Sequence, residues 1–445
     1  MFVSANAIYR LSYMIARNGM YNHNMRGKKN KLGGILLLVV LCIGVAVGTC
    51  MLFSQMNKAE INDNNDNVAN SEPEPEPEPD PIAQSAKMRI MFAGTTFWGR
   101  RTNQLARASE LGVKYPFSKL DTLHRENYDA WIGGLECPLV QKEGNVHNYA
   151  EENSIFKFNC DPDYLPEAKK YFTAFLLGNN HTDNQGGGVG LTETRKHLDE
   201  AGIQYFGTPK YTGTADSELS RDTKEATNCG IVVLPINVAY DNKETKKIQM
   251  PFGFCSAHGV FGVPGQDYIE NMRTYATYVP TIAMPHMGAE YQASHDELRQ
   301  NLYRQMIDAN VESVIGDHPH WVQDAEAYKN RLIVYSMGNF MFDQYDGMEY
   351  SRSAAIEANA EIAVSGVNFD EWDELGKGCL KDKSTCFDKI KSAKLPKISI
   401  VWKYDFHATT SANDCITRLS SQAEHNSVAQ RLRWSSIPAA LKVSN

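Results

Sequence analysis

Residues 314–321 read VIGDHPHW, an apolar run of strand length that stops at Gly316 and is followed by two histidines with one proline between them. Proline fixes its own φ at about −65°, so the backbone holds His318 and His320 in a defined relation at a predicted strand end. Taken alone, such a short motif is more often a pair of surface histidines than a binding site. Its meaning depends on the residues at the ends of the other strands.

Strand-length apolar runs alternate with helical patterns from residue 88 onward. Helices are expected at 191–202, where Gly202 is a stop signal, and at 295–311. Strands are expected at residues 89–93, 130–132, 172–177, 230–236, 281–284, 311–315 and 332–335. This alternation predicts an α/β domain with much of its sheet buried on both faces.

The domain is expected to cover residues 88–410, and its C-terminal part is less regular than the rest. A charged insertion is expected at about 366–395, and residues 396–406, PKISIVWKYDF, predict a late strand that returns to the sheet. Residues 411–445 are interpreted as a C-terminal extension, because the last thirty residues carry no clear structural signal.

Five of the predicted strands end in glycine or proline followed by hydrogen-bonding or metal-ligating residues. The stretches are GTTFWGRR (94–101), GGLE (133–136), GNNH (178–181), PHMGAEY (285–291) and GDHPH (316–320). In open α/β sheets, ligands gather beyond the carboxyl ends of the strands. Five such coincidences are hard to attribute to chance, so these side chains are expected to converge on one site.

The residue types at these strand ends predict a metal site. They offer neutral imidazoles, a carboxylate and an amide oxygen, from His286, His318, His320, Glu136 and Asn180. This mixed set suits Mn, Fe or Zn and is too nitrogen-rich for Ca or Mg. Each residue also has an ordinary interpretation: Glu136 as a salt-bridge partner, Asn180 as a turn residue, His286 as a packed histidine. Jointly, a metal site explains them more economically.

Four longer stretches carry a family resemblance: FKFNCDPDYLPEAKKYFTAFLLGNNH (156–181), GLTETRKHLDEAGIQYFGT (190–208), PHMGAEY (285–291) and VIGDHPHWVQDAEAYKNRLIVYSMGNFMFD (314–343). They resemble the CapA/PgsA family of bacterial capsule (poly-γ-glutamate) synthesis proteins, whose domain belongs with the calcineurin-like metallophosphoesterases. The resemblance covers about residues 88–343. It implies a four-layer α/β/β/α metallophosphoesterase-like sandwich with a dinuclear metal centre at the strand ends.

The resemblance also implies roles for the metal-ligating residues. Glu136 would be the carboxylate that bridges two ions. Asn180, His286 and His318 would complete the ligands of one ion, and His320 would contribute to the other. Two ions about 3.5–4 Å apart activate a water and stabilise the charge that develops on the attacked group.

Further roles are implied by the same resemblance. His181 is implied as the imidazole that protonates a leaving group, and Arg100 as an anion clamp. Arg101 and Glu290 join Arg100 as candidates for contact with the substrate. An acidic domain does not attract a polyanion as a whole, so local basic residues of this kind would be needed for polymer binding.

The chain departs from the family pattern at several positions. Where the family has Gly-Asp after the first strand, this chain has Gly94 and Thr95, and a neutral hydroxyl is a poorer ligand than a carboxylate. Gly134 replaces an asparagine, Met287 replaces a tryptophan, and Asp183 comes one residue early. We therefore predict one well-bound metal rather than two, and a protein that is catalytically weak or a scaffold if its chemistry needs both.

Residues 32–53 predict a single transmembrane helix. This run of 22 uncharged residues is long enough to cross a hydrocarbon layer of roughly 30 Å. Residues 1–31 carry six basic residues and no acid, which predicts a cytoplasmic N-terminus and an exported main domain. The alternatives are a cleaved signal peptide, for which the run is too long, and a lipoprotein signal ending at Cys50, for which Thr49 is a poor preceding residue.

Residues 54–87 predict an acidic, Pro-rich linker between the membrane and the folded domain. Its end, EPEPEPEPDP (72–81), cannot build a core and should run as an extended polyproline-type spacer. Glu72 to Pro81 alone would span roughly 30 Å. The linker therefore holds the domain away from the bilayer.

The cysteine count limits the possible disulfides, and the net charge limits the classes of partner. Seven of the nine cysteines lie outside the predicted span, so at least one must stay free or pair with another chain. Cys379 and Cys386 are the strongest candidates for a disulfide. The net charge of −8 gives no indication of a nucleic-acid partner.

Three functions are consistent with these features. The first is a membrane-anchored, extracytoplasmic capsule protein that acts on, exports or supports synthesis of an anionic polymer such as poly-γ-glutamate, with other capsule synthase subunits as partners. The second is a metal-dependent phosphoester hydrolase. The third is a non-catalytic scaffold subunit, which Thr95 and Gly134 favour. Metal content separates the first two from the third, and the substrate separates the first from the second.

Overall fold

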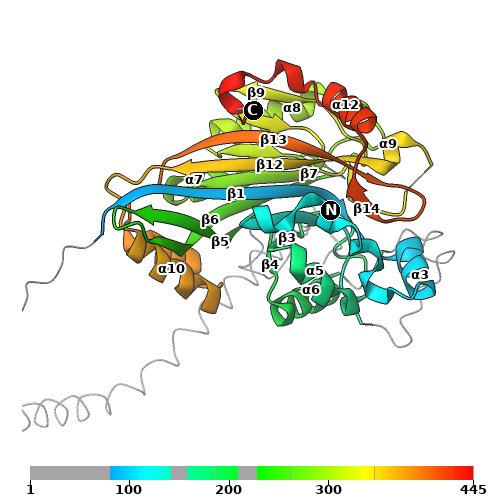
Figure 1. Cartoon of the computed structure of the whole chain (residues 1–445), viewed down its shortest axis with the longest axis horizontal. Helices are drawn as coiled ribbons and strands as arrows, with labels where there is room; N and C mark the ends of the chain where they lie inside the picture. The colour runs from blue at the N-terminus through cyan, green and yellow to red at the C-terminus, as the bar shows by residue number, and fades with distance from the viewer. Residues whose placement is uncertain are drawn as a thin grey trace, which may run out of the picture. The chain divides into compact units, whose positions relative to one another are not determined.

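A computed structural model describes residues 81–141, 158–185, 187–208, 228–260, 262–344 and 346–443 (Figure 1). The predicted cytoplasmic segment 1–31, the predicted span 32–53 and most of the predicted linker 54–87 lie outside these residues. Within the described ranges, no helix combines the length and the apolar character needed to cross a membrane.

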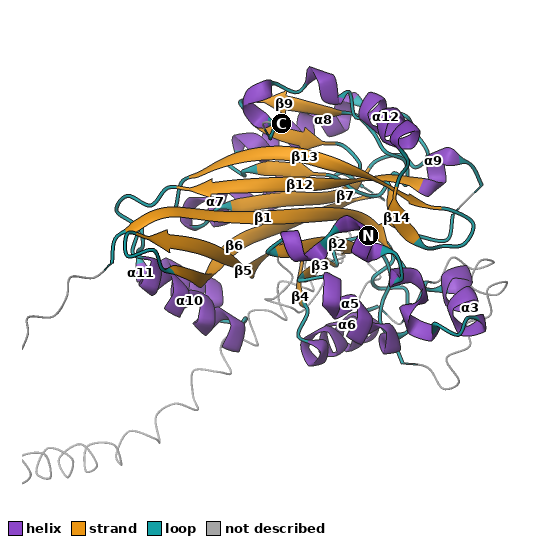
Figure 2. Ribbon diagram, in the orientation of Figure 1, coloured by secondary structure: helices purple, strands orange, loops and turns teal. Residues whose placement is uncertain are grey.

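The described residues alternate between strands and helices, which confirms the α/β class with a large central sheet (Figure 2). The strands are β1 Ala83–Thr96, β2 Ala130–Leu135, β3 Ala174–Leu176, β4 Gln204–Phe206, β5 Cys229–Tyr240, β6 Thr245–Gly259, β7 Thr281–Met287, β8 Ser313–Ile315, β9 Ala325–Tyr328, β10 Arg331–Val334, β11 Asn339–Met341, β12 Arg352–Ile362, β13 Ile400–Ser411 and β14 Thr417–Leu419. The α-helices are α3 Arg100–Ala108, α5 Leu165–Tyr171, α6 Gly188–Ala201, α7 Gln266–Tyr278, α8 Glu297–Asp308, α9 Met348–Ser351, α10 Phe369–Lys381, α11 Cys386–Ala393 and α12 Gln422–Arg431. The 3₁₀ helices are η1 Gly112–Phe117, η2 Leu120–Leu123, η3 Arg125–Asn127, η4 Pro162–Tyr164, η6 Trp434–Ser436 and η7 Ala439–Leu441.

Strand β1 organises the sheet, because it pairs differently along its two edges. On one edge, residues 86–92 pair antiparallel with β12, which continues to β13 and β14. On the other edge, residues 83–87 pair antiparallel with β5, and residues 90–96 pair in parallel with β2. Two branches therefore leave the same edge: β2-β3-β4, and β5-β6-β7-β8-β10-β9.

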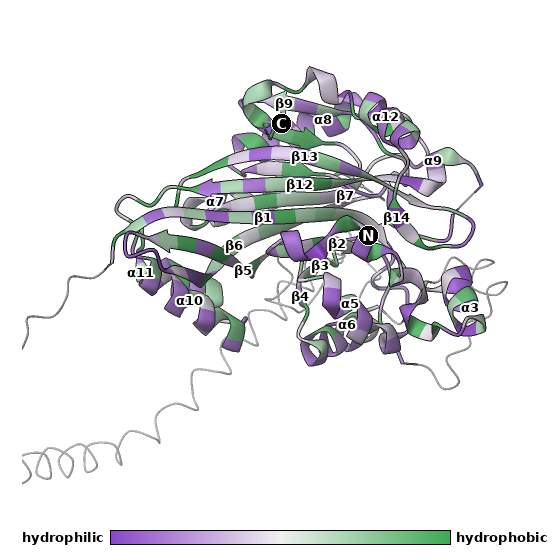
Figure 3. Ribbon diagram, in the orientation of Figure 1, coloured by the Kyte–Doolittle hydropathy of each residue, from purple (hydrophilic) through white to green (hydrophobic). Residues whose placement is uncertain are grey.

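Three hydrophobic clusters separate the layers of this arrangement. Alternate residues of a strand face opposite sides, and β1 divides accordingly: Ile90 and Phe92 belong to the cluster between the two branches, and Met91 and Ala93 to a cluster under α3, α5 and α6. A third cluster joins β6, β7 and β8 to α7 and α8. In Figure 3, hydrophobic residues concentrate along the central strands, whereas the outer helices are mostly hydrophilic.

The helices and strands expected from sequence are present with shifted ends, and the structure contains further elements that the sequence patterns did not predict. Helix α6 ends at Gly202, whose φ of 67° lies in the left-handed region that glycine adopts readily. Sequence patterns missed β6, β12 and α7, and the predicted insertion 366–395 forms α10 and α11. The predicted C-terminal extension 411–445 packs on the rest of the domain, because Val428 and Leu441 belong to the hydrophobic cluster between the branches.

The described cysteines form three disulfides: Cys137–Cys160, Cys229–Cys255 and Cys379–Cys386. The predicted pair Cys379–Cys386 is confirmed, and it joins α10 to α11. Among the described residues, Cys415 is a buried free thiol, in agreement with the prediction that at least one cysteine stays free or pairs with another chain.

A buried carboxylate ties β1, β12 and β13 together. Glu357 of β12 is 3% exposed and accepts two hydrogen bonds of 2.7 Å from Arg89. Tyr128, Asn359 and His407 lie within hydrogen-bonding distance of the same carboxylate, at 2.9, 2.8 and 3.1 Å. Burial alone would raise the pKa of Glu357, but these hydrogen bonds outweigh it and lower the pKa below its ordinary value of 4.5.

We expect Glu357→Gln to lower the free energy of unfolding at pH 7 by about 2–4 kcal/mol, because it leaves buried donors without a charged acceptor. The folded-state pKa lies below the unfolded one, so this contribution is complete above pH 4.5 and is lost as the pH falls below it. Urea unfolding of both proteins between pH 7 and pH 3 measures the difference. Glu361→Gln, an exposed change on the same strand, is the control, and a gap that widens in acid would contradict the assignment.

Candidate metal centre

The sequence-predicted metal ligands lie at the carboxyl ends of strands from both branches. Glu136 follows β2 directly, and Asn180 lies in the loop after β3. On the other branch, His286 is near the end of β7, and His318 and His320 come after β8. Strands β2 and β3 run in parallel, as do β7 and β8, so each pair delivers its loops to one edge.

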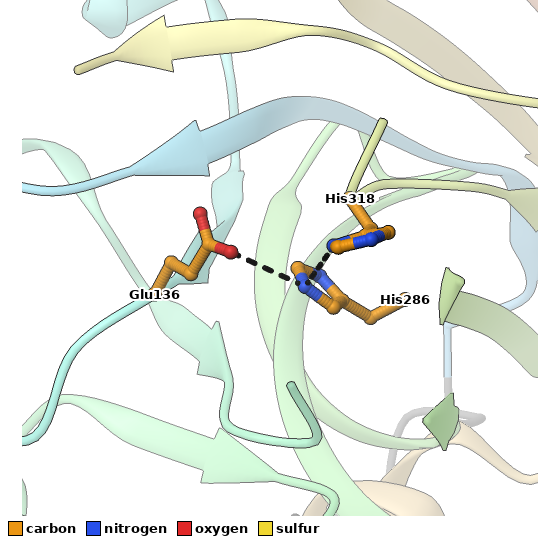
Figure 4. Close-up of side chains that lie close together, drawn as sticks. All are labelled: Glu136, His286 and His318. Atoms are coloured by element: carbon orange, nitrogen blue, oxygen red, sulfur yellow. Dashed lines mark hydrogen bonds and ion pairs between the residues drawn. The ribbon is translucent and has the colours of Figure 1, made fainter. Parts of the chain in front are cut away.

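Three of these side chains surround one nitrogen of a fourth, Nε2 of His286. It lies 3.4 Å from Oε1 of Glu136 and 3.2 Å from Nδ1 of His318 (Figure 4). The same nitrogen lies 2.8 Å from Oδ1 of Asn180. Glu136, His286 and His318 are each about 1% exposed, and they offer ligand atoms within 4.8 Å of one another. This group could hold a metal ion.

The chemistry of the buried group fits a cation. Within the described part of the chain, neither carboxylate oxygen of Glu136 has a hydrogen-bond partner. Burial raises the pKa of Glu136 to about 7 and lowers the pKa values of His286 and His318 well below the ordinary range, so both imidazoles are neutral. Neutral imidazoles and a carboxylate that lacks donors are the ligands a transition metal takes.

His320 lies beside this group and is oriented by strand β11. Its Nδ1 is 2.8 Å from Oδ1 of Asn339 in β11, so Nδ1–H donates a hydrogen bond to the amide oxygen and the ring orientation is fixed. Its ring also stacks on Tyr291, with centroids 5.7 Å apart. His318 and His320 have φ values of 98° and 61°, a strained conformation for residues other than glycine and one that is concentrated at functional sites.

His181 borders the group through its neighbour Asn180. Its Nδ1 lies 2.7 Å from Oδ1 of Asn184, and because that oxygen also accepts the backbone N–H of Phe158, the amide orientation is fixed. The His181 ring stacks on Phe158 with centroids 3.7 Å apart. Burial lowers the pKa of His181 to about 4, so the ring is neutral and presents a lone pair at Nε2.

The three predicted substrate-contact residues, Arg100, Arg101 and Glu290, differ in their surroundings. The guanidinium of Arg100 forms a bidentate ion pair with the carboxylate of Asp343 and is 4.3 Å from the Phe158 ring centroid. Arg101 donates from Nη2 to the backbone oxygen of Asn413 at 3.0 Å. Glu290 is partly exposed and lies 4.0 Å from Nε2 of His318. Arg100 thus already has an anionic partner, whereas Glu290 borders the candidate metal-binding group.

Asp317 and Asn339 are the site residues that sequence patterns missed. Asp317 is fully buried between Gly316 and His318, and it accepts a 2.8 Å hydrogen bond from the hydroxyl of Thr95. Asn339 belongs to the stretch YSMGNF (335–340). The sequence does mark both positions. Each residue follows a glycine that comes after a predicted strand, as Glu136 and Asn180 do.

The fold and site define a class: α/β proteins with a buried candidate metal centre at their strand ends. Residues 89–344 match the family model described as "Bacterial capsule synthesis protein PGA_cap". This match covers more than half of the chain, so the chain belongs to this family of bacterial capsule synthesis proteins, and the resemblance expected from its motifs is confirmed.

Two curated relatives are similar to the chain. "Capsule biosynthesis protein CapA" of Bacillus anthracis is 24% identical over 278 residues, 59% of this chain and 61% of the relative. "PGA biosynthesis protein CapA" of Bacillus subtilis (strain 168) is 24% identical over 271 residues, 60% of this chain and 65% of the relative. The chain therefore spans less than two thirds of either. A solved protein from Thermus thermophilus covers 60% of this chain and 93% of its own, at 11% identity and a TM-score of 0.30, too low to support a fold assignment.

We expect the purified full-length chain to retain a transition metal, and His318→Ala or Glu136→Gln to weaken that binding by at least about 10-fold, because each change removes a ligand atom from the group. Metal analysis after dialysis against trace Mn²⁺ or Zn²⁺ measures the effect. His197→Ala, which removes a partly buried histidine of α6, should leave metal content unchanged. Full retention in His318→Ala would remove His318 from the ligand set.

Proposed function

We propose that this chain is a membrane-anchored, extracytoplasmic protein of capsule biosynthesis that acts on or supports synthesis of an anionic polymer such as poly-γ-glutamate. Family membership and the names of both relatives support the polymer-related role. The observation that carries the mechanism is the buried group of Glu136, His286 and His318 within the family-matched region. The nascent polymer and other capsule synthase subunits are its proposed partners.

An extracytoplasmic location is supported by features at two points of the chain. The uncharged run 32–53, with a basic segment before it and an acidic spacer after it, supports a cytoplasmic N-terminus and an exported domain. Three disulfides in the described domain support an oxidising compartment. A domain held at the outer face of the membrane would meet a surface polymer near its exit.

The finer fold proposed is the four-layer metallophosphoesterase-like sandwich. Its support is the set of three hydrophobic clusters, two between helices and strands and one between the branches that leave β1. The proposed ion is Mn, Fe or Zn, one or two per chain, with Glu136, Asn180, His286 and His318 as ligands at the better-equipped position. Bound there, such an ion would polarise an oxygen of the substrate and lower the pKa of a coordinated water.

The residues of the chain itself prepare the rest of the site. Asn339 orients His320, and Asn184 fixes His181 with a lone pair at Nε2. His181 would therefore take a proton from water at Nε2 before it gives one to a leaving group. An anionic substrate would have to compete with Asp343 for the guanidinium of Arg100. Release of this ion pair would be part of substrate binding.

Hydrolysis of phosphoesters and a non-catalytic scaffold role are the second and third candidates. The scaffold role has a specific observation in its favour: position 95 presents a hydroxyl that is already donated to Asp317. The hydrolase role draws on the same metal-binding group as the capsule role. Substrate therefore separates the hydrolase from the capsule protein, and dependence on Glu136 separates both from a scaffold.

The test is complementation of a deletion strain of the source organism, with γ-linked glutamate at the cell surface as the measurement. We expect the unmodified chain to restore the polymer and Glu136→Gln to restore only a small fraction, because it removes the carboxylate of the metal-binding group. Glu361→Gln, an exposed change of the same kind, should restore it fully. Equal restoration by Glu136→Gln would favour the scaffold.

Purified protein provides the complementary measurement. Metal-dependent cleavage of p-nitrophenyl phosphate, together with no effect of the deletion on γ-linked glutamate, would overturn the capsule proposal in favour of the hydrolase. Polymer loss in the deletion strain, restored by the unmodified chain, supports the capsule proposal whether or not the model phosphoester is cleaved.

A further inference from the structure

The side of His286 that faces away from Glu136 is bordered by a second buried carboxylate. Nδ1 of His286 lies 3.9 Å from Oδ2 of Asp317. Within the described part of the chain, neither atom has a hydrogen-bond partner, and the two residues are 1% and 0% exposed. Two buried polar atoms that face each other without partners need an explanation, because such atoms are rare and costly.

The backbone fixes Asp317 against His286. The two residues form a parallel β-bridge, and the backbone N–H of Asp317 donates to the oxygen of Pro285 at 2.9 Å. The other carboxylate oxygen, Oδ1, accepts the hydroxyl of Thr95 from β1 at 2.8 Å. Asp317 is therefore held by its backbone on β7 and by its side chain on β1, which leaves Oδ2 directed at the imidazole.

Glycine at position 134 makes room for this carboxylate. A Cβ atom added to Gly134 would lie 2.4 Å from Oδ2 of Asp317, far inside van der Waals contact. Strands β1, β2 and β7 thus close around the carboxylate: β1 donates a hydrogen bond, β2 leaves space and β7 presents the imidazole. Thr95 and Gly134, two departures from the family pattern, both contact Asp317.

We propose that Asp317 is the positioning residue of the metal centre: its Oδ2 accepts a hydrogen bond from Nδ1–H of His286 and so keeps the lone pair of Nε2 directed at the ion. The inference rests on the proposed metal centre and adds to it a residue outside the ligand set. A metal-ligating histidine almost always donates its other ring N–H to a carboxylate, carbonyl or water, which fixes its tautomer and orientation.

The tautomer requirement accounts for the observed distances. Nε2 of His286 is 2.8 Å from the amide oxygen of Asn180, an atom that only accepts, so that hydrogen bond places the proton on Nε2 and a lone pair on Nδ1. A lone pair and a carboxylate do not attract, in keeping with 3.9 Å. A cation at Nε2 requires the other tautomer, in which the proton is on Nδ1 and Asp317 is its acceptor. The ring carries one proton in both forms.

The test is Mn²⁺ titration of the full-length chain after treatment with chelator, followed by calorimetry. We expect Asp317→Ala to weaken Mn²⁺ binding by about 10- to 100-fold, the usual effect of losing such a partner. Asp317→Asn should lose less, because an amide oxygen can still accept from Nδ1. Gly134→Ala should weaken binding in the unmodified background and have little effect in Asp317→Ala, since the oxygen that it would displace is then missing.

Thermal unfolding separates positioning from a merely structural role. In chelator, Asp317→Asn should unfold at a temperature at least as high as the unmodified chain, because it removes a buried carboxylate that lacks a charge partner. With saturating Mn²⁺, its gain in unfolding temperature should be smaller than that of the unmodified chain, since its affinity is lower. If Asp317 only stabilised the fold, its replacement would lower the unfolding temperature equally with chelator and with Mn²⁺.

A matched pair of threonine variants keeps the test decisive if changes at Asp317 prevent folding. Thr95→Val removes the donor to Asp317 and should weaken Mn²⁺ binding, whereas Thr96→Val removes a hydroxyl that donates to the backbone of Gly94 and should not. Unchanged Mn²⁺ affinity in Asp317→Ala, or in Thr95→Val if Asp317→Ala does not fold, would overturn this inference and leave the proposed centre intact. Absence of Mn²⁺ binding by the unmodified chain would overturn both.

Discussion

The divided pairing of β1 is the constraint on which the rest of the molecule depends. One edge is committed to β12, while the other edge is shared by β5 and β2, so the sheet separates into two branches with hydrophobic side chains between them. The first branch supplies Glu136 and Asn180, and the second supplies His286 and His318. Their side chains meet because both branches start from one strand, which also brings Thr95 into contact with the loop after β8.

Burial determines the electrostatic character of the centre. Inside the protein, desolvation disfavours both the carboxylate of Glu136 and the protonated forms of His286 and His318. A divalent cation reverses this balance, because it supplies the positive charge that the carboxylate lacks and occupies the lone pairs of neutral imidazoles. Burial also raises the pKa of Asp317 to about 7, so a second carboxylate of this region is destabilised in its charged form. A metal ion could therefore take the place of the protons that burial otherwise favours on these carboxylates.

Sequence patterns predicted the α/β class and the residues that meet in the candidate metal-binding group, because apolar runs that end in glycine mark buried strands and their loops. They missed β6, where Pro251 and Gly253 interrupt the pattern of a strand that is central to one branch. They also missed Asp317, whose surroundings are made by Thr95 and Gly134, residues distant in the chain. Such contacts are visible only once the strands are paired. From sequence, Thr95 is only a position that lacks the family's carboxylate, whereas in the structure its hydroxyl donates to the carboxylate of Asp317.

The pairing of β1 with β12, and of β12 with β13, has a consequence for biosynthesis. The first strand of the domain stays without a partner on that edge until more than two hundred further residues have left the ribosome, and the cluster between the branches also needs α12. Contacts between residues this distant in the chain make folding slow, because the entropy lost in closing the intervening chain must be offset before the contacts stabilise the fold. An N-terminal fragment of the domain therefore cannot complete its sheet, and the fold can form only after nearly the whole chain has been made.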